Sequence, residues 1–222
     1  MNELSAFDVI GPVMVGPSSS HTAGAARIGL AAHHLLGSVP VAARIELHGS
    51  FAATGKGHAT DRALVAGMLG WKSDDERLKN SLESGLRVEF ENVDLGEEAH
   101  PNSARLTLTD TKGRTCRVLG ASLGGGMIEI REVDGFEARF HGNLPVLAVW
   151  HIDQPGFLAK LTAVLACAEV NIAAIRTNRQ HRAEEAFTVV ETDEMVPEDC
   201  RSVIARITGV HHLRQLPRLT EG

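Results

Sequence analysis

The sequence predicts an α+β protein made of two domains, and three observations lead to this fold class. The chain has 222 residues, which exceeds one typical domain and is short for three. Hydrophobic residues make up 43% of it and charged residues 23%, which provides apolar material for two modest cores. Gly142, Asn143 and Pro145 interrupt an alternation of short strands and helices. We therefore expect one domain over residues 1–142 and a second over residues 143–222.

The first domain is predicted to be an α/β unit, because helical and strand periodicities alternate along it. A helix with an apolar face is expected from Ala25 to Leu36, then a strand over Val41–Leu47 and a helix over Asp61–Leu69 with Thr60 as N-cap. A strand follows through Leu86, Val88 and Phe90. A hairpin then reverses at Asp110–Gly113 and returns to Leu119, and the last strand runs through Ile128 and Ile130 after Gly124–Gly126. The order of the strands in the sheet does not follow from these patterns.

The second domain shows a strand, helix, strand, strand, helix, strand order. Val146–Ile152 is a nearly all-apolar strand, and apolar residues then recur at helical spacing from Phe157 to Ala168. Two strands over 171–177 and 186–192 flank a polar turn, a helix follows Pro197, and Val210–Leu216 forms the last strand. This βαββαβ order predicts a ferredoxin-like fold.

Composition and charge argue against several function classes. The net charge is −6, and no run of lysines and arginines exceeds two residues, so we expect no nucleic-acid partner. Residues 1–10 carry Glu3 and Asp8 and do not resemble a secretory signal, and no stretch approaches about 18 apolar residues. We expect a cytoplasmic protein without a membrane segment.

Cysteine and histidine spacing gives no metal-binding pattern. Cys116, Cys167 and Cys200 are far apart and are predicted to be buried thiols, too few to hold an iron-sulfur cluster on this chain alone. The eleven histidines contain no HxH or HExxH pattern. We expect no metal bound by this chain.

Three segments carry residues suited to binding an anion or a substrate. Ser18, Ser19, Ser20, His21 and Thr22 precede the first helix, where backbone N–H groups and the helix dipole favour an anion. The alternative is that one serine caps this helix and His21 only packs or faces water.

The second segment, Gly49 to Asp61, joins a strand to a helix. Its glycines allow close approach of a ligand to the backbone, and Lys56 and His58 could supply positive charge or move a proton. It is not a nucleotide-binding loop, because the spacing differs from Walker A. A tight turn with a solvated lysine is the alternative.

The third segment is His151 to Gly156, which ends a strand and starts a helix. Such a corner either binds a ligand or only starts the helix.

The motifs taken together resemble those of a known enzyme family. VGPSSSHTAG (Val15–Gly24), HGSFAATGKGHATD (His48–Asp61) and the His100, Pro101, Asn102 element resemble the beta subunit of two-subunit iron-sulfur L-serine dehydratases. HIDQPGFLAKL (His151–Leu161) and VNIAAI (Val170–Ile175) resemble an ACT domain. The two resemblances cover nearly the whole chain.

The resemblance implies deamination of L-serine to pyruvate and ammonia, with a [4Fe-4S] cluster on a separate, cysteine-rich alpha subunit. There the iron would act as a Lewis acid on the serine hydroxyl while a base removes the α-proton. It implies His21 as the catalytic residue of this chain and self-association through the ACT domain. The implied substrate-binding residues are Ser18, Ser19, Ser20, Thr22, Lys56, His58, Thr60 and Asp61.

In ACT domains of the phosphoglycerate dehydrogenase type, the effector-binding positions match His151, Asp153 and Asn171. Asp153 departs from that pattern, which has asparagine there, and its carboxylate would repel the carboxylate of an effector. The competing interpretation is a non-catalytic sensor of an amino acid or small anion, related to the regulatory domains of phosphoglycerate dehydrogenase. The chain lacks the GxGxxG unit that dinucleotide binding would require.

Overall fold

The computed structural model describes residues 14–16, 18–54 and 59–220. Lys56 and His58, two of the predicted substrate-binding residues, lie outside the described residues. Within the described ranges, no helix is long and apolar enough to cross a membrane.

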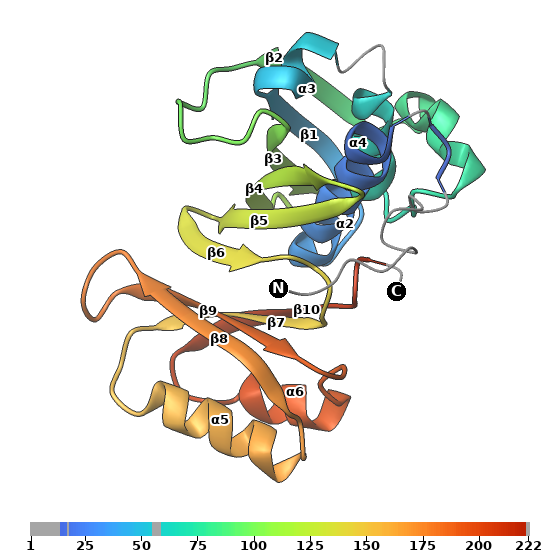
Figure 1. Cartoon of the computed structure of the whole chain (residues 1–222). Coiled ribbons are helices and arrows are strands. Elements are labelled where there is room, and N and C mark those ends of the chain that lie inside the picture. Colours follow the sequence, from blue (N-terminus) through green and yellow to red (C-terminus); the bar gives the residue numbers. More distant parts are fainter. Residues whose placement is uncertain (1–13, 17, 55–58, 221–222) are drawn as a thin grey trace, which may run out of the picture.

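A six-stranded mixed sheet forms the first part of the molecule, in the order β2-β1-β3-β4-β5-β6 (Figure 1). Strands β1 and β2 pair in parallel, and the strands from β3 to β6 form an antiparallel meander. The parallel pair requires a crossover connection, and the intervening helices provide it. The strands are β1 (Pro40–Leu47), β2 (Arg87–Asn92), β3 (Ser103–Asp110), β4 (Thr115–Gly124), β5 (Met127–Val133) and β6 (Phe136–Phe140).

Two helices, α2 (Ala25–Leu36) and α4 (Thr60–Met68), pack closely against each other beside this sheet (Figure 1). Their backbones touch where two glycines face the partner helix. A Cβ added to Gly67 would lie 2.0 Å from the carbonyl oxygen of Ala26, and one added to Gly29 would lie 2.3 Å from that of Leu64. Both positions therefore require glycine at this crossing. The remaining helical segments are the π-helical turn η1 (Ser19–Gly24), which runs directly into α2, the short helix α3 (Gly49–Thr54) and the 3₁₀ segment η2 (Glu76–Glu83).

The second sheet has four antiparallel strands in the order β10-β7-β9-β8, with helices α5 and α6 on one face (Figure 1). The βαββαβ prediction is confirmed. The elements are β7 (Val146–Ile152), α5 (Phe157–Cys167), β8 (Ile172–Arg179), β9 (Glu185–Thr192), α6 (Glu198–Ile204) and β10 (Val210–Leu216).

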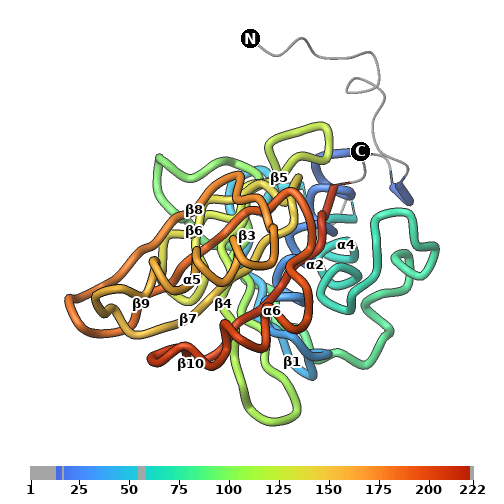
Figure 2. The backbone as a smooth tube through the Cα atoms, turned by 90° about the horizontal axis from the view of Figure 1, so that it is seen from below, coloured from blue at the N-terminus to red at the C-terminus, as the bar shows by residue number. Residues whose placement is uncertain are grey.

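The other face of the second sheet packs on the first part of the chain. Phe187 of β9 lies 6.0 Å from Phe136 of β6 and 4.7 Å from Trp150 of β7, measured between ring centroids. Trp150 Nε1 also donates a hydrogen bond to Asp134. Seen from below in Figure 2, the elements of the second sheet lie in front of those of the first. The chain passes from one sheet to the other between Phe140 and Val146, and one continuous apolar core includes residues of both. The division at residue 142 stays a prediction.

Four local features differ from the predictions. Thr60 is not the N-cap of α4: Ala59 takes that position at φ 59°, and Thr60 is the first helical residue with its side chain fully buried. The glycine-rich segment after β1 opens with helix α3 instead of a turn. Strand β6 was not predicted. Cys167, the last residue of α5, is exposed, whereas Cys116 and Cys200 are buried as predicted.

Candidate functional site

The segment from Ser18 to Thr22 forms the start of a helix, as predicted. Ser18 is the N-cap, and its Oγ accepts a hydrogen bond from the backbone N–H of His21 at 3.3 Å. The first turn is π-helical, a conformation that is rare and is often found at functional sites. The capping interpretation of one serine is thus correct for Ser18, and Ser19, Ser20 and His21 remain half-buried at the helix start.

Three hydroxyl groups surround the imidazole of His21. Its Nδ1 lies 3.4 Å from Ser18 Oγ, and its Nε2 lies 3.2 Å from Ser50 Oγ and 3.1 Å from Thr54 Oγ1. The ring also meets Phe51 edge-on, with centroids 5.3 Å apart. Thr54 Oγ1 donates its one proton to the carbonyl oxygen of Ser50 at 2.8 Å, so towards His21 Nε2 it can only accept. The contacts therefore hold the ring in place and favour the tautomer with its proton on Nε2, which leaves Nδ1 to accept from Ser18 Oγ.

Ser50 and Thr54 were not predicted as site residues, although both lie in the second motif. They occupy successive turns of helix α3, at the i, i+4 spacing that places two side chains on one face. The signal was present in the sequence, but the segment was interpreted as a turn. Helix α3 thus joins the first and second motifs through His21.

The His100, Pro101, Asn102 element lies against the same helix. Ser50 N donates a hydrogen bond to the carbonyl oxygen of Pro101 at 2.7 Å. Gly49 has φ 56°, and a Cβ there would lie 2.6 Å from that oxygen, so only glycine fits. The His100, Pro101, Asn102 element therefore lies next to the Ser18–Thr22 segment and the segment that begins at Gly49.

The β4–β5 hairpin also lies close to the helix start. A Cβ added to Gly24 would lie 2.1 Å from Ser122 Oγ, and one added to Gly124 would lie 3.9 Å from Ser20 Oγ. Arg27 Nη1 donates a hydrogen bond to the carbonyl oxygen of Gly126. The Gly124–Gly126 run, a weak signal by itself, therefore lies beside the helix start.

The remaining predicted residues differ in accessibility. Thr22 is fully buried below Gly16, whose added Cβ would lie 2.3 Å from Thr22 Oγ1. Thr60 is also fully buried, and its Oγ1 has no hydrogen-bond partner among the described residues. Asp61 is half-buried and accepts a hydrogen bond from Arg62 N. A buried hydroxyl without a partner costs about 1–3 kcal/mol, so a group that reached Thr60 would recover part of that energy.

Two of the predicted effector residues, His151 and Asp153, lie at the carboxyl end of β7, whereas Asn171 lies just before β8, two strands away and at the opposite end of the sheet. Each already has protein partners. His151 is 2% exposed, contacts Ile152 O through Nδ1 and Thr188 Oγ1 through Nε2, and stacks on Phe157 at 3.5 Å. Burial lowers its pKa, so the ring is neutral at pH 7.

Asp153 accepts hydrogen bonds from Ala183 N and from Arg179, which lower the pKa of its carboxyl. Asn171 Nδ2 donates to Asp193 at 2.7 Å. The structure thus places two of the three effector residues in polar contacts at the surface and His151 in the core.

The donor set does not fit an iron-sulfur cluster held by this chain. Within the described ranges, no three histidine, cysteine or acidic side chains are grouped as metal ligands would be. Cys116 and Cys200 are buried in apolar surroundings, and burial raises the pKa of each thiol. Cluster ligands are thiolates, so these two environments are unsuited to that task.

Two family models match separate parts of the chain. A family model described as "Serine dehydratase beta chain" matches residues 5–87, and an ACT domain model matches residues 146–209. The chain is 40% identical to "Probable L-serine dehydratase, beta chain" of Bacillus subtilis, over 95% of this chain and 96% of that protein.

It is also 38% identical to "L-serine dehydratase, beta chain" of Peptoniphilus asaccharolyticus, over 92% of this chain and 94% of that protein. A D-3-phosphoglycerate dehydrogenase of Synechocystis is 30% identical over 58% of this chain, which is 23% of the dehydrogenase. The first two relatives match this chain almost from end to end. On these grounds, the chain belongs to the serine dehydratase beta-chain family.

Proposed function

We propose that this chain is the beta subunit of a cytoplasmic L-serine dehydratase, which deaminates L-serine to pyruvate and ammonia together with a separate alpha subunit. The observation that carries the proposal is the similarity to two beta chains. Each match covers more than nine tenths of this chain and more than nine tenths of the relative. The dehydrogenase matches over little more than half of this chain, which favours the enzyme subunit over a free-standing sensor.

The [4Fe-4S] cluster would lie on the alpha subunit, which would be rich in cysteine. The support for this is the donor set of this chain, with two buried thiols and no grouping of ligands among the described residues. By itself, the chain would not convert L-serine.

His21 is the candidate catalytic residue that this chain would contribute to the assembled site. Its ring is half-buried and is oriented by the hydroxyls of Ser18, Ser50 and Thr54. These are the properties of a group that accepts or donates a proton next to a substrate.

The helix start around His21 would bind the carboxylate of L-serine, because backbone N–H groups and hydroxyls converge there. Thr22 and Thr60 are buried, so they would support this surface from below. The proposed substrate-binding set is Ser18, Ser19, Ser20, Thr22, Lys56, His58, Thr60 and Asp61.

The test is anaerobic pyruvate formation from L-serine by this chain alone, by a cysteine-rich alpha subunit alone, and by the two mixed. We expect activity only in the mixture. If this chain alone turns over L-serine, the division of labour between subunits is wrong. If the mixture neither associates nor reacts after cluster reconstitution, the sensor interpretation becomes the better account.

His21→Ala in the mixture is expected to lower kcat by about 100-fold or more, the range usual for loss of general acid–base catalysis. His181→Ala, at an exposed turn, is the matched control and should leave kcat unchanged. Size-exclusion chromatography of the mixture separates a catalytic role from a role in assembly. Unchanged turnover in His21→Ala would reduce His21 to a packing residue.

The second domain would mediate self-association and effector binding through His151, Asp153 and Asn171. The support for self-association is the position of β8, which lies at the edge of its sheet and exposes 39% of Ile175. Sedimentation of the full chain carrying Ile175→Lys tests this, with Arg176→Lys as the control. Only Ile175→Lys should shift the protein to a smaller species.

A further inference from the structure

Strand β2 forms one edge of the six-stranded sheet, the edge farther from the second sheet (Figure 1). It pairs in parallel with β1 and with no other described strand. The opposite edge is covered, because β6 packs against β8 and β9, and Asn178 Nδ2 donates a hydrogen bond to Glu137 O at 2.7 Å. Within the described ranges, β2 is therefore the edge of this sheet that is open to another chain.

The backbone of β2 presents unpaired groups on its outer side. Val93, just after the strand, donates its N–H to Leu47 O of β1 at 2.8 Å. In a regular ladder every second residue bonds to the same neighbour, so the N–H of Glu89 also points to β1. The N–H and C=O groups of Val88 and Phe90 then point outward, where a further strand would bond to them.

The apolar layer beneath the sheet is incomplete at this edge. Val88 and Phe90 lie opposite Ala43 and Ile45 of β1, two residues of the core, and thus on the face that the helices cover. Phe90 nevertheless stays 42% exposed. An apolar side chain placed beside Phe90 would remove that surface from water.

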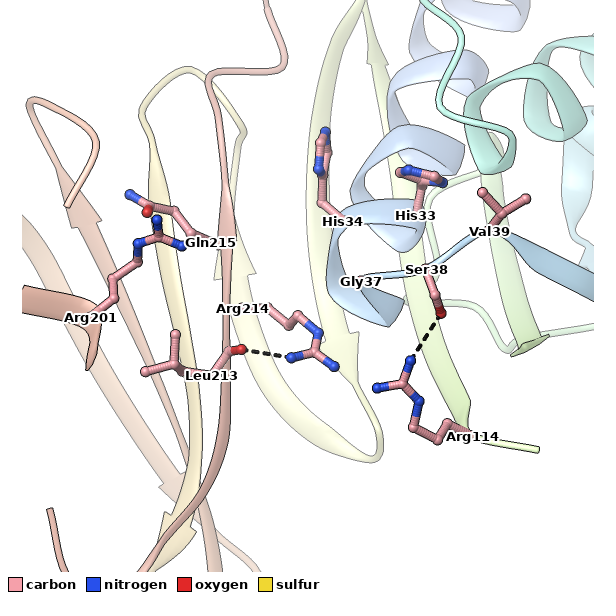
Figure 3. A pocket seen from close by; sticks show the side chains of 10 residues that line it. All are labelled: His33, His34, Gly37, Ser38, Val39, Arg114, Arg201, Leu213, Arg214 and Gln215. Atoms are coloured by element: carbon pink, nitrogen blue, oxygen red, sulfur yellow. Dashed lines mark hydrogen bonds between the residues drawn. The ribbon is translucent and has the colours of Figure 1, made fainter. Parts of the chain in front are cut away.

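The other face of β2 carries charged side chains at alternate positions from Arg87 to Glu91. Arg87 forms no hydrogen bond or ion pair with a described residue. Arginines elsewhere have partners within the chain: at the junction of α2 and β10, Arg114 donates to Ser38 and Arg214 donates to Leu213 O (Figure 3). The guanidinium of Arg87 is therefore available to a carboxylate of another chain.

An antiparallel pair of two β2 strands, related by a two-fold axis at Glu89, satisfies all three features. Val88 then lies opposite Phe90 of the second copy, so their outward backbone groups exchange hydrogen bonds and their side chains pack together. Arg87 lies opposite Glu91 of the second copy, which gives two opposite-charge pairs across the axis. An axis at Phe90 would instead place Glu89 opposite Glu91 twice, and like charges directly opposite are unfavourable.

We propose that two copies of this chain associate through β2, which joins their six-stranded sheets into one continuous sheet. The contact is isologous, because the same strand is used by both copies. It goes beyond the proposed function: it uses neither the His21 site nor the β8 edge of the second sheet.

The test is sedimentation velocity of the full chain carrying Ile175→Lys, so that association through β8 does not contribute. We expect monomer and dimer in an equilibrium that shifts to dimer between about 1 and 200 µM. In this background, Arg87→Glu and Glu91→Arg each place two like-charged pairs across the axis and should weaken dimerisation at least about tenfold. Arg206→Glu, at an exposed position of the second domain, is the matched control and should not weaken it.

Mixing the two variants separates a broken contact from a damaged fold. An equimolar mixture of the Arg87→Glu and Glu91→Arg chains restores both opposite-charge pairs in the mixed dimer, so it should dimerise about as tightly as the parent. A damaged fold would not be rescued by mixing. Glu89→Gln should tighten the dimer about threefold, because it removes the one like-charged pair that meets at the axis.

Amide hydrogen exchange gives a readout at the strand itself. The N–H groups of Val88 and Phe90 should become protected as the chain is concentrated, whereas that of Glu89, which bonds to β1, is the internal control and should not change. A chain that stays monomeric up to about 200 µM, or a mixture no better than either variant, would refute the proposal. If only the alpha subunit protects these two amides, the added strand belongs to another protein and self-association through β2 is wrong.

Discussion

Adding one methyl group at the crossing of α2 and α4 tests whether this contact fixes the spacing of the His21 site. Helix propensity and packing make opposite predictions for Gly67→Ala. By propensity alone, replacing a glycine within a helix stabilises it by about 1 kcal/mol. By packing, the new Cβ would lie 2.0 Å from the oxygen of Ala26 and 2.7 Å from the nitrogen of Leu30, both backbone atoms that cannot rotate away.

Packing should win. A carbon and an oxygen need more than 3 Å of separation, so the helices must move apart by about 1 Å, which in a filled core costs about 1–3 kcal/mol or more. Since other contacts along the crossing are lost as the helices separate, we expect a net destabilisation of about 2 kcal/mol and a fall in Tm of about 4–8 °C.

The measurement is thermal and urea unfolding by circular dichroism. Arg62→Ala, at an exposed position of the same helix, is the control and should change stability by less than about 0.5 kcal/mol. A Gly67→Ala chain as stable as the parent, or more so, would show that the helices do not touch at this glycine. Since α4 begins at Thr60 and α2 continues the His21 segment, the variant should also lower activity of the assembled enzyme.

Three further predictions concern ionisable groups. Burial opposes ionisation of Asp110, but hydrogen bonds from Arg114, Ser38 and Lys112 outweigh this effect and lower the pKa of Asp110 to about 2. The stability that Asp110 contributes is therefore present above about pH 4 and is lost as pH falls toward 2. Urea midpoints of the parent and Asp110→Asn should differ at pH 6 and converge only as pH falls through about 2, and a constant difference would contradict this. Burial lowers the pKa of His151, so its contribution is complete above about pH 6.5 and declines below it; an NMR titration in which the ring protonates at or above pH 6.5 would disprove the assignment. Finally, a thiol reagent should modify Cys167 quickly in the native chain and the buried cysteines only after unfolding, and Cys167→Ser should abolish the fast reaction.

Local periodicity was sufficient to predict much of the fold. The second domain was predicted in its full βαββαβ order, because Val146–Ile152 is a nearly all-apolar run, apolar residues recur at helical spacing from Phe157, and a polar turn separates the next two strands. The β3–β4 hairpin was predicted from its alternation and from the polar turn at Asp110–Gly113. Helix α3 and strand β6 were missed, because elements of five or six residues contain too few repeats to show a period.

Within the site, the sequence by itself determined that Ser18 to Thr22 begin a helix, because capping is a local interaction between near neighbours. Only the tertiary structure decided that Ser50 and Thr54 meet His21, about thirty residues away, and that Thr22 and Thr60 are buried.

The contact between the two sheets likewise arises only when distant segments pack together. Phe136 of β6 and Trp150 of β7 both meet Phe187 of β9, and no local pattern predicts this cluster. A sequence determines which groups are near neighbours along the chain. Which side chains are enclosed together, and which charges stay unbalanced, depends on long-range packing that no local period encodes.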